Sequence, residues 1–378
     1  MKKLLLIIFT MTALSYRAQD ILINYDVDTT IHKVAGPLKL WIDFLKTKDD
    51  STGAKYWNDA EVKKYGYTSY FLLENELDFG MDNFLESLSY STIKILQVKQ
   101  NAGFFRISSL VEFKPEAAKS NIPYIFHVYV KEQKGNFKLY NAIGINTELY
   151  LNHADIGYIR YHYPKSHVFN RALAQKQSDF IAKFAKNFEV QPDTIQYYFG
   201  SDHEELNNLK GLDFITGNSG EQLPFGKADA ANKMVYSSGL GEYYPHELIH
   251  VILYKKYKKT HLWFEEGVAT CFGMSRGKDL DWHLKKVNAY LLLHPGLDLN
   301  NLTKLQNMDA TTAFKYALGG FLIRYAYEKG GYALIKILLN AGNTDAEFYK
   351  ALKEHLGLEQ SALNTFLRSE LKKRYEKT

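Results

Sequence analysis

The sequence predicts an α+β protein of two domains, in which helices and antiparallel strands occupy separate stretches of the chain. In residues 19–150, helical spacing of apolar residues comes first, and short segments rich in Ile, Val, Tyr and Phe follow between turn residues. In residues 151–378, strand and helix patterns alternate at first, and helical periodicity dominates from Tyr244 onward. With 378 residues the chain is long enough for two sizeable cores.

The N-terminal domain is expected to place helices first and a meander of antiparallel strands afterwards. Apolar residues at helical spacing predict helices over residues 37–45 and 81–88. Turns with the sequences Asn-Ala-Gly, Ser-Asn-Ile-Pro and Lys-Gly-Asn separate four predicted strands, over residues 92–98, 103–113, 122–130 and 136–145. This order of elements resembles the cone-shaped fold of the nuclear transport factor and cystatin-like group.

The C-terminal domain is expected to consist of a small lobe that contains strands and a helical lobe. The predicted elements of the first lobe are a strand, an amphipathic helix and two short strands, over residues 156–164, 168–188, 194–199 and 233–238. Residues 211–230 are rich in Gly, Asn and Asp, which predicts a loop. The helical patterns from Tyr244 to the C-terminus form the second lobe.

The first 18 residues have the layout of a secretory signal peptide. Lys2 and Lys3 form a short basic start, an apolar run of 11 residues follows over Leu4–Leu14, and cleavage is expected after Ala18. The run is shorter than the about 20 residues that a membrane-spanning helix needs. We therefore expect a secreted or periplasmic protein with no stable membrane insertion after cleavage. The alternative is an ordinary buried N-terminal helix.

The composition limits the classes of partner. Cleavage after Ala18 would remove three basic and no acidic residues, so the formal net charge would fall from +5 to +2. Such a chain has no electrostatic case for binding nucleic acid or an anionic membrane surface. The single cysteine, Cys271, cannot form an internal disulfide, so the core has to stabilise the fold. The 28 Tyr and 23 Phe residues are typical of strands that pack a core rather than of a sugar-binding platform.

The stretch YYPHELIHVILY, residues 243–254, places two histidines and a glutamate within an apolar helical pattern. It has two readings: a metal site, or a core helix that carries histidine. On a helix, His246 and His250 lie about 40° apart on one face, so both imidazoles can reach one ion. Glu247 lies beside that face, where it can take a proton from a metal-bound water without being a ligand.

A third ligand is expected from the next helical pattern, HLWFEEGVAT, residues 261–270. The basic connector over residues 255–259 allows the two helices to fold back antiparallel, so a carboxylate of the second helix can face the histidines. Two His and one Glu, with water in the fourth position, form a catalytic zinc shell rather than a structural one.

H-E-x-x-H followed by W-φ-x-E-G-φ-A resembles the gluzincin superfamily of metallopeptidases, which includes the thermolysin-like and aminopeptidase-N-like enzymes. In that superfamily the glutamate directly before the glycine binds the metal, which maps to Glu266. The 15 residues between His250 and Glu266 are fewer than is typical of the aminopeptidases, which implies a shorter loop between the helices.

Residues 315–324, KYALGGFLIR, are similar to the Y-x-x-G-A/G-x-φ-φ-R helix that follows the zinc site in the aminopeptidase-like branch. The resemblance implies that the hydroxyl of Tyr316 points at the metal and stabilises an oxyanion. Gly330 and Gly331 are expected to end this helix, and residues 332–339 to start another.

Together these residues predict a zinc metallopeptidase that acts on a peptide or protein substrate. The metal ligands would be His246, His250 and Glu266, with Zn²⁺ as the cofactor. Glu247 would act as general base and then as proton donor to the leaving amine, and Tyr316 would stabilise the oxyanion together with the metal.

The resemblance also bears on how the substrate binds. In such peptidases the substrate backbone adds to an edge strand beside the site helix, which is expected here at residues 214–217 or 233–238. The exopeptidase branch carries a G-x-M-E-N strand that this sequence lacks, so an endopeptidase is favoured. The competing class is a binding protein, in which the N-terminal domain recognises a partner and an inactive peptidase-like domain is a scaffold. The N-terminal domain itself is open to three roles: targeting module, substrate-presenting lobe or inhibitory prodomain.

Other residues near the motifs are expected to be structural. His261 is predicted to be a solvated loop residue. Glu265 faces about 100° away from Glu266 on a helix, which predicts a surface or salt-bridge residue. Cys271 is expected to be a buried, inert thiol. Thr270 has two equal readings: a hydrogen-bond partner behind the metal ligands, or plain packing.

Overall fold

The computed structural model describes residues 20–47, 50–67, 69–73, 91–101, 103–113, 121–216 and 223–376. The protein has a mixed α and β structure with a helical C-terminal part, as the sequence predicts. It divides into two compact units, one formed by Met1–Ile145 and Lys210–Ser219 and the other by Asn146–Leu209 and Gly220–Thr378. The predicted signal peptide and the predicted helix over residues 81–88 lie outside the described residues.

The first unit is built on a six-stranded sheet with the order β1-β2-β3-β4-β5, in which β9 also pairs with β4. The strands are Asp20–Ile23 (β1), Ser91–Asn101 (β2), Phe104–Phe113 (β3), Asn121–Gln133 (β4), Asn136–Tyr140 (β5) and Leu212–Ile215 (β9). The β1–β2 pair is parallel, and the other pairs are antiparallel. The predicted strands over 92–98, 103–113 and 122–130 are therefore confirmed.

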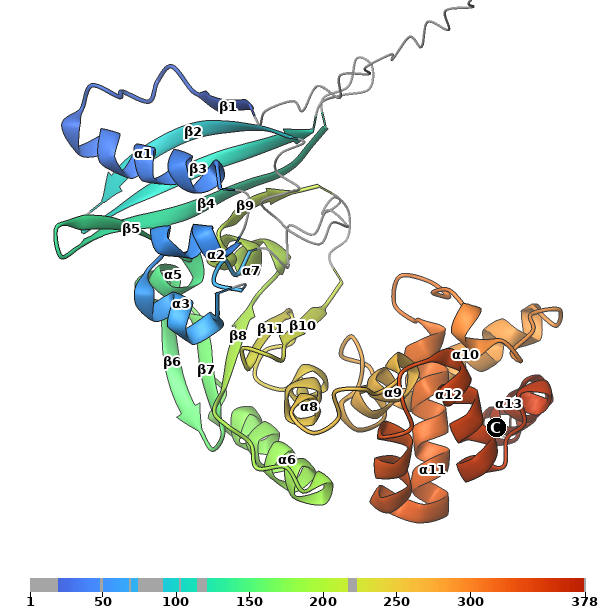
Figure 1. Ribbon diagram of the computed structural model, residues 1–378. Helices are drawn as coiled ribbons and strands as arrows, with labels where there is room; N and C mark the ends of the chain where they lie inside the picture. The colour runs from blue at the N-terminus through green and yellow to red at the C-terminus, as the bar shows by residue number, and fades with distance from the viewer. Residues whose placement is uncertain are drawn as a thin grey trace, which may run out of the picture. The chain divides into compact units, whose positions relative to one another are not determined.

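Among the described residues, the helical segments that precede β2 are His32–Leu45 (α1), Asp50–Gly53 (α2), Ala54–Tyr56 (η1) and Asp59–Tyr65 (α3). Helix α1 lies across the sheet in Figure 1, and its Trp41 and Phe44 are buried in the core of the unit. The ring of Trp41 stacks on Phe44 at 5.4 Å between centroids and meets Phe126 edge-on at 6.0 Å. Here the aromatic residues pack a core, as expected.

The predicted strand over residues 136–145 ends early, at Tyr140. The helix α5, Ala142–Tyr150, follows it. Asn141 separates the two elements because its backbone and side-chain N–H groups both donate to Oε2 of Glu61, at 3.0 Å each. This contact between residues far apart in the sequence overrides the apolar strand pattern.

The Gly-rich stretch 211–230, predicted to be a loop, contains two strands. One is β9 of the first sheet, where Nη2 of Arg106 binds Oδ1 of Asp213 at 2.7 Å. The other is Phe225–Asp229 (β10), which belongs to the second unit. Both strands are too short, at four and five residues, to show the apolar alternation that identifies longer strands.

The second unit contains a five-stranded sheet with the order β10-β11-β8-β7-β6. Besides β10, its strands are Leu151–Ile156 (β6), Ile159–Pro164 (β7), Ile195–Gly200 (β8) and Met234–Ser238 (β11). The central pairs are parallel and the two outer pairs antiparallel. The strand predicted over 156–164 is half of a hairpin that turns at Gly157, whose φ of 58° favours glycine.

One of the two expected positions of the edge strand, residues 233–238, is wrong, because β11 (Met234–Ser238) lies between β10 and β8 inside the sheet. The other expected position, residues 214–217, overlaps β9, which belongs to the sheet of the first unit. The edge strand next to the helical part is β10, which pairs only with β11 in the described part of the chain.

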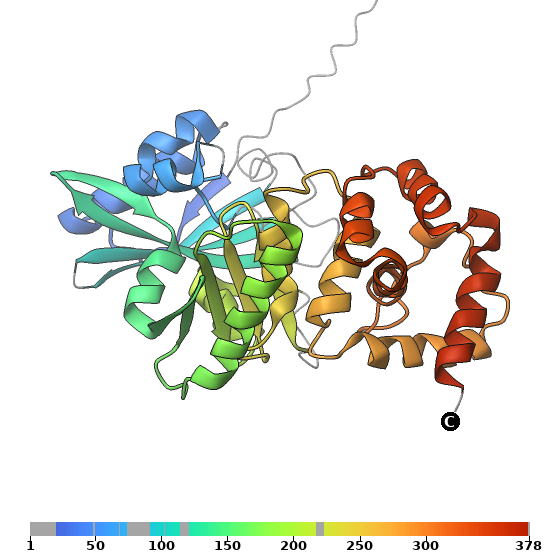
Figure 2. The same cartoon turned by 90° about the horizontal axis from the view of Figure 1, so that it is seen from below.

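The remaining helices all belong mainly to the second unit. They are Arg171–Phe188 (α6), His203–Lys210 (α7), Pro245–Tyr254 (α8), Leu262–Gly273 (α9), Leu280–Leu293 (α10), Leu302–Lys304 (η2), Phe314–Leu339 (α11), Asp345–Ala351 (α12), Leu352–Leu356 (η3), Gln360–Ala362 (η4) and Leu363–Tyr375 (α13). Figure 2 looks nearly along α11, which the other C-terminal helices surround. Gly330 and Gly331 have non-helical backbone angles within α11, which confirms the predicted break. In the described part of the chain, no helix combines the length and the apolar character that crossing a membrane requires.

Candidate metal centre

Helix α8 is held at its N-terminus by buried polar side chains. Pro245 occupies the first helical position, where a backbone N–H would have no partner within the helix. The N–H of Tyr244 donates to Oε1 of Gln177 at 2.5 Å, and the hydroxyl of Tyr197 donates to the carbonyl oxygen of Gly241 at 2.9 Å. These bonds tie the first turn of α8 to α6 and β8.

Helix α9 begins at a buried histidine rather than at a solvated one. Nδ1 of His261 accepts a hydrogen bond from the N–H of Trp263 at 3.3 Å, and its Nε2 lies 3.2 Å from Oδ1 of Asp345. The ring stacks on Phe348 with 4.6 Å between centroids. With an exposed fraction of 5 %, His261 contradicts the predicted loop role, because it caps the helix and packs against α12.

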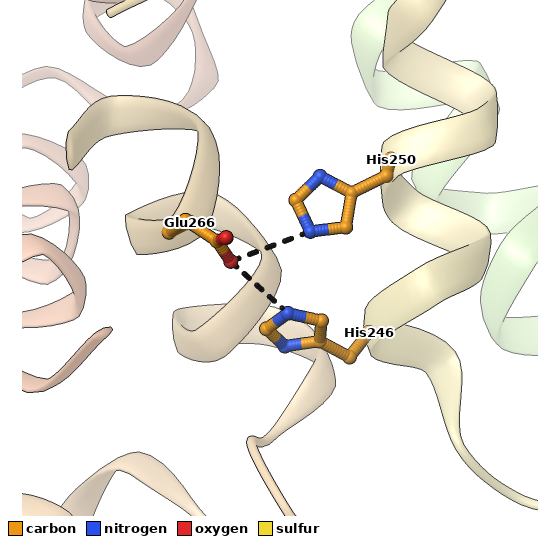
Figure 3. Close-up of side chains that lie close together, drawn as sticks. All are labelled: His246, His250 and Glu266. Carbon is orange, nitrogen blue, oxygen red and sulfur yellow. Dashed lines mark hydrogen bonds and ion pairs between the residues drawn. The ribbon is translucent and has the colours of Figure 1, made fainter. Parts of the chain in front are cut away.

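Side chains from α8 and α9 converge on one point, as Figure 3 shows for His246, His250 and Glu266. Oε2 of Glu266 lies 3.3 Å from Nε2 of His246 and 3.5 Å from Nε2 of His250. All three ligand atoms lie within 4.8 Å of one another. Two atoms that bind a tetrahedral zinc ion at about 2.0–2.1 Å are about 3.3 Å apart. The observed separations therefore fit a zinc ion bound by all three side chains.

The second nitrogen of each histidine ring has its own hydrogen-bond partner. Nδ1–H of His246 donates to the carbonyl oxygen of Met274 at 2.5 Å, and Nδ1–H of His250 donates to Oε1 of Glu265 at 3.1 Å. Because Nδ1 carries the proton in each of these bonds, a neutral ring would have Nε2 available to bind a metal ion. Metal-binding histidines characteristically have such partners, which orient the ring and raise its basicity.

Glu265 is a salt-bridge residue, as one of its predicted readings states, and its partner is His250. The carboxylate stays 41 % exposed while it binds the ring. The sequence does not identify this partner, because the contact depends on how α8 and α9 are placed against each other. The carbonyl of Met274 had no sequence signal at all, since every residue carries one.

The charges of the cluster shift the pKa values of its members. Burial favours the neutral form of Glu266, yet hydrogen bonds to His246 and His250 hold the pKa of Glu266 well below its usual range. Burial also disfavours a charged His250, yet hydrogen bonds to Glu265 and Glu266 hold the pKa of this histidine well above its usual range. The cluster therefore attracts positive charge, and a metal ion would replace the proton on His250.

Glu247 follows the first histidine on α8 and lies against strand β10. A Cβ atom on Gly226 of β10 would lie 2.7 Å from both Cγ and Oε1 of Glu247, so the glycine makes room for this carboxylate. Glu247 is only 7 % exposed and is not among the three side chains whose ligand atoms converge. Its position is that of a group beside the ligands rather than of a ligand.

Tyr316 reaches the cluster from α11 because α9 and α11 cross in close contact. A Cβ atom on Gly267 would lie 2.6 Å from the carbonyl carbon and oxygen of Gly319, so the crossing requires glycine. The ring centroid of Tyr316 lies 6.0 Å from that of His246. Burial first, and then the negative charge of Glu266, raise the pKa of Tyr316, so the phenol keeps its proton at neutral pH.

Two neighbours of the ligands have structural roles. Oγ1 of Thr270 has no hydrogen-bond partner in the part of the chain that the structure describes, which favours the packing reading. Cys271 is partly buried rather than fully buried as predicted, and burial raises its pKa to about 12, in keeping with the expected inert thiol.

Comparison of the chain with models of known protein families and with curated proteins finds no match. The chemistry of the site is therefore inferred from its own atoms. Two imidazole nitrogens and one carboxylate oxygen are the protein ligands of several catalytic zinc centres, which keep a fourth position for water or substrate. The donor set, the separations and the partners of both rings all fit such a centre.

Proposed function

We propose that this protein is an exported zinc metallopeptidase of gluzincin type, with the ion held by His246, His250 and Glu266. The observation that carries this proposal is the convergence of these three ligand atoms at tetrahedral spacing. A zinc ion bound there would polarise the carbonyl of a scissile peptide and lower the pKa of a water molecule. Helices α8, α9 and α11 and the five-stranded sheet are in keeping with a gluzincin fold for the second unit, and the sheet of the first unit with the cone-shaped cystatin-like group.

Glu247 is the general base in this mechanism. Its carboxylate takes a proton from the attacking water and delivers it to the leaving amine. The side chain is nearly buried between α8 and Gly226, so it borders the space in front of the ligands without occupying a ligand position. Metal binding alone would not need this carboxylate, which favours an enzyme over a binding protein.

Tyr316 donates a hydrogen bond to the oxyanion that forms from the substrate carbonyl. Its raised pKa keeps the phenol protonated at neutral pH, so that it can donate this hydrogen bond. A preorganised donor of this kind, aimed at the oxygen where charge develops, is one of the larger contributions to catalysis.

In this proposal the substrate backbone adds to the outer edge of β10, the edge away from β11. Strand β10 lies beside the site helix, since Gly226 meets both Tyr244 and Glu247. The strand reads Phe225-Gly226-Lys227-Ala228-Asp229 and contains no glutamate of the kind that holds a free amino group in the aminopeptidase-like branch. An endopeptidase therefore remains the favoured class.

Metal content and hydrolysis test this proposal together. The purified protein, loaded with zinc and dialysed, is expected to hold one zinc ion per chain, and the Glu266→Ala variant much less. The Glu247→Gln variant is expected to keep its zinc and to lose about 100-fold or more in peptide hydrolysis. Zinc in the wild type without hydrolysis of any peptide library would favour the binding-protein class. Unchanged hydrolysis in Glu247→Gln would contradict the mechanism.

A further inference from the structure

The turn that follows α9, residues Met274–Lys278, is built as a rigid unit beside the metal ligands; we call it the Met274 turn. Met274 and Arg276 have positive φ angles of 66° and 48°, and Gly277 has 72°. Ser275 and Lys278 exchange two backbone hydrogen bonds of 2.8 and 2.9 Å. Three left-handed residues in a row of four leave this backbone little freedom to rearrange.

Buried side chains hold the Met274 turn from the α10 side. His283 is fully buried and its Nε2–H donates to the carbonyl oxygen of Ser275 at 3.0 Å. The hydroxyl of Thr312 lies 3.1 Å from Nδ1 of the same ring and donates to it. The neighbouring carbonyl, that of Met274, accepts from His246. The position of the turn is thus tied to the position of a metal ligand.

The turn is also held from the α8 side, through Arg276. The backbone N–H of Arg276 donates to the hydroxyl of Tyr244 at 3.3 Å. The ring of Tyr244 in turn stacks on His246, with 5.7 Å between centroids and 7° between the planes. Arg276 therefore stands on a fixed backbone next to the first metal ligand.

The guanidinium group of Arg276 is an unmatched cation at this position. Within the described part of the chain it takes part in no ion pair and in no side-chain hydrogen bond, and the residue is only partly exposed. A partly buried guanidinium normally finds a carboxylate, since it presents five N–H donors and keeps its charge.

We propose that Arg276 binds a carboxylate group of the substrate and thereby selects peptides that carry one close to the scissile bond. The inference rests on the proposed peptidase function and adds its substrate class. Glu247, Glu265 and Glu266 would repel an anionic peptide, so a cation on a rigid turn is needed to receive it. The planar guanidinium suits this role because it can hold a carboxylate by two parallel hydrogen bonds.

Two sources of the carboxylate are possible: the C-terminus of the peptide and an acidic side chain. A peptide set in four forms distinguishes them, with a C-terminal acid or amide combined with Glu or Gln at each position of an otherwise constant sequence. Cleavage by the zinc-loaded protein is followed by mass spectrometry, and kcat/KM is measured for each form. Preference for the C-terminal acid assigns the first source, and preference for Glu over Gln assigns the second.

The variants Arg276→Gln, Arg276→Lys and Lys278→Gln separate recognition from general electrostatics. Lys278 is an exposed cation of the same turn, so its replacement removes the same charge nearby. In Arg276→Gln, kcat/KM for the preferred carboxylate form is expected to fall by at least about tenfold, the effect of losing one charged hydrogen-bonded pair. The neutral form should change by less than about twofold. For the carboxylate form, kcat/KM of Arg276→Lys should lie between the values of the wild type and Arg276→Gln, and kcat/KM of Lys278→Gln should equal that of the wild type.

Equal losses on the carboxylate and the neutral forms in Arg276→Gln would overturn the inference, as would a wild type that prefers neither form; hydrolysis itself would still support the peptidase. If no peptide is cleaved, binding of N-acetyl-glycyl-phenylalanine and of its amide to the zinc-loaded protein decides by calorimetry. Tighter binding of the acid that Arg276→Gln abolishes would keep the carboxylate site and reject the peptidase. Equal binding of the two forms would reject the carboxylate site as well.

Discussion

Two largely buried carboxylates, Glu61 in the first unit and Glu266 in the second, have pKa values shifted in opposite directions. Burial raises the pKa of Glu61 to about 7, and the N–H groups of Asn141 only partly offset this. Burial acts on Glu266 in the same sense, but two imidazoles reverse the shift. The comparison teaches that a neutral amide does not keep a buried carboxylate charged, whereas rings that can carry charge do. Glu266 therefore stays negatively charged in the cluster and favours the binding of a cation.

The largest expected effect comes from removing the charge of Glu266 while keeping its shape. Glu266→Gln should weaken zinc binding by more than about 100-fold, since even partners behind the ligands commonly contribute 10- to 100-fold. Competition with a chelator measures the zinc dissociation constant, and hydrolysis should fall with zinc content. The same change at Glu61, distant from the cluster residues in the sequence, is the matched control and should leave zinc binding unchanged. A zinc affinity equal to that of the wild type in Glu266→Gln would show that this residue is not a ligand.

Glu61→Gln is expected to have the next largest effect, on stability rather than on the metal. Because the folded state binds the proton of Glu61 more tightly than the unfolded state, stability is greatest below about pH 4.5 and falls as pH rises to about 7. The shift from 4.5 to about 7 corresponds to about 3 kcal/mol above pH 7. The variant should remove this loss, because glutamine still accepts from Asn141 without a charge.

Denaturant unfolding of wild type and Glu61→Gln at pH 5 and pH 8 measures the effect. The variant should gain stability relative to the wild type at pH 8 and little or nothing at pH 5. If the free energy of unfolding had the same pH dependence in both proteins, Glu61 would be charged at neutral pH in the folded state. Glu61 and Glu266 would then both be charged, and their pKa values would not be shifted in opposite directions.

The sequence predicts the side chains of the site better than its backbone groups and long-range contacts. His246, His250 and Glu266 are side chains on helices, so their 3.6-residue periodicity and the motif spacing already place them towards one point. The Met274 carbonyl and the edge strand β10 were beyond prediction, because backbone groups have no residue signature and a strand with Gly226 at its second position resembles a loop. The prediction that His261 is a solvated loop residue failed for a different reason. Its contacts with Asp345 and Phe348 join residues more than 80 positions apart, and the sequence does not reveal such contacts.

Replacement of Glu265 tests whether a charged partner behind the His250 ring strengthens zinc binding. Glu265→Gln keeps an oxygen that accepts from Nδ1–H of His250 but removes the charge, so His250 becomes a weaker base. We expect zinc affinity to fall by about tenfold, the lower end for such partners, because the carboxylate is 41 % exposed. The pKa of His250 should fall as well, because the hydrogen bond to the Glu265 carboxylate helps to hold that pKa high. No change in either quantity would show that the Glu265–His250 contact does not tune the ligand.

The smallest expected effect concerns His283. This residue binds the carbonyl of Ser275, and the neighbouring carbonyl of Met274 accepts from His246. His283→Leu leaves the Ser275 carbonyl and the Thr312 hydroxyl without their partner, which should cost about 1–3 kcal/mol of stability. Because the Met274 carbonyl then becomes less well placed to orient His246, zinc affinity should also fall, by a few-fold. His283→Gln can still donate to Ser275 and should recover most of the affinity.

The absorption spectrum of the cobalt-substituted protein separates these two consequences of His283→Leu. Its ligand-field bands report the geometry around the ion, so a change in the orientation of His246 should alter them even in protein that is fully folded. Glutamine at this position should restore the wild-type spectrum if the hydrogen bond to Ser275 is what matters. A leucine variant that is less stable but has unaltered bands would show that His283 supports the turn without orienting His246.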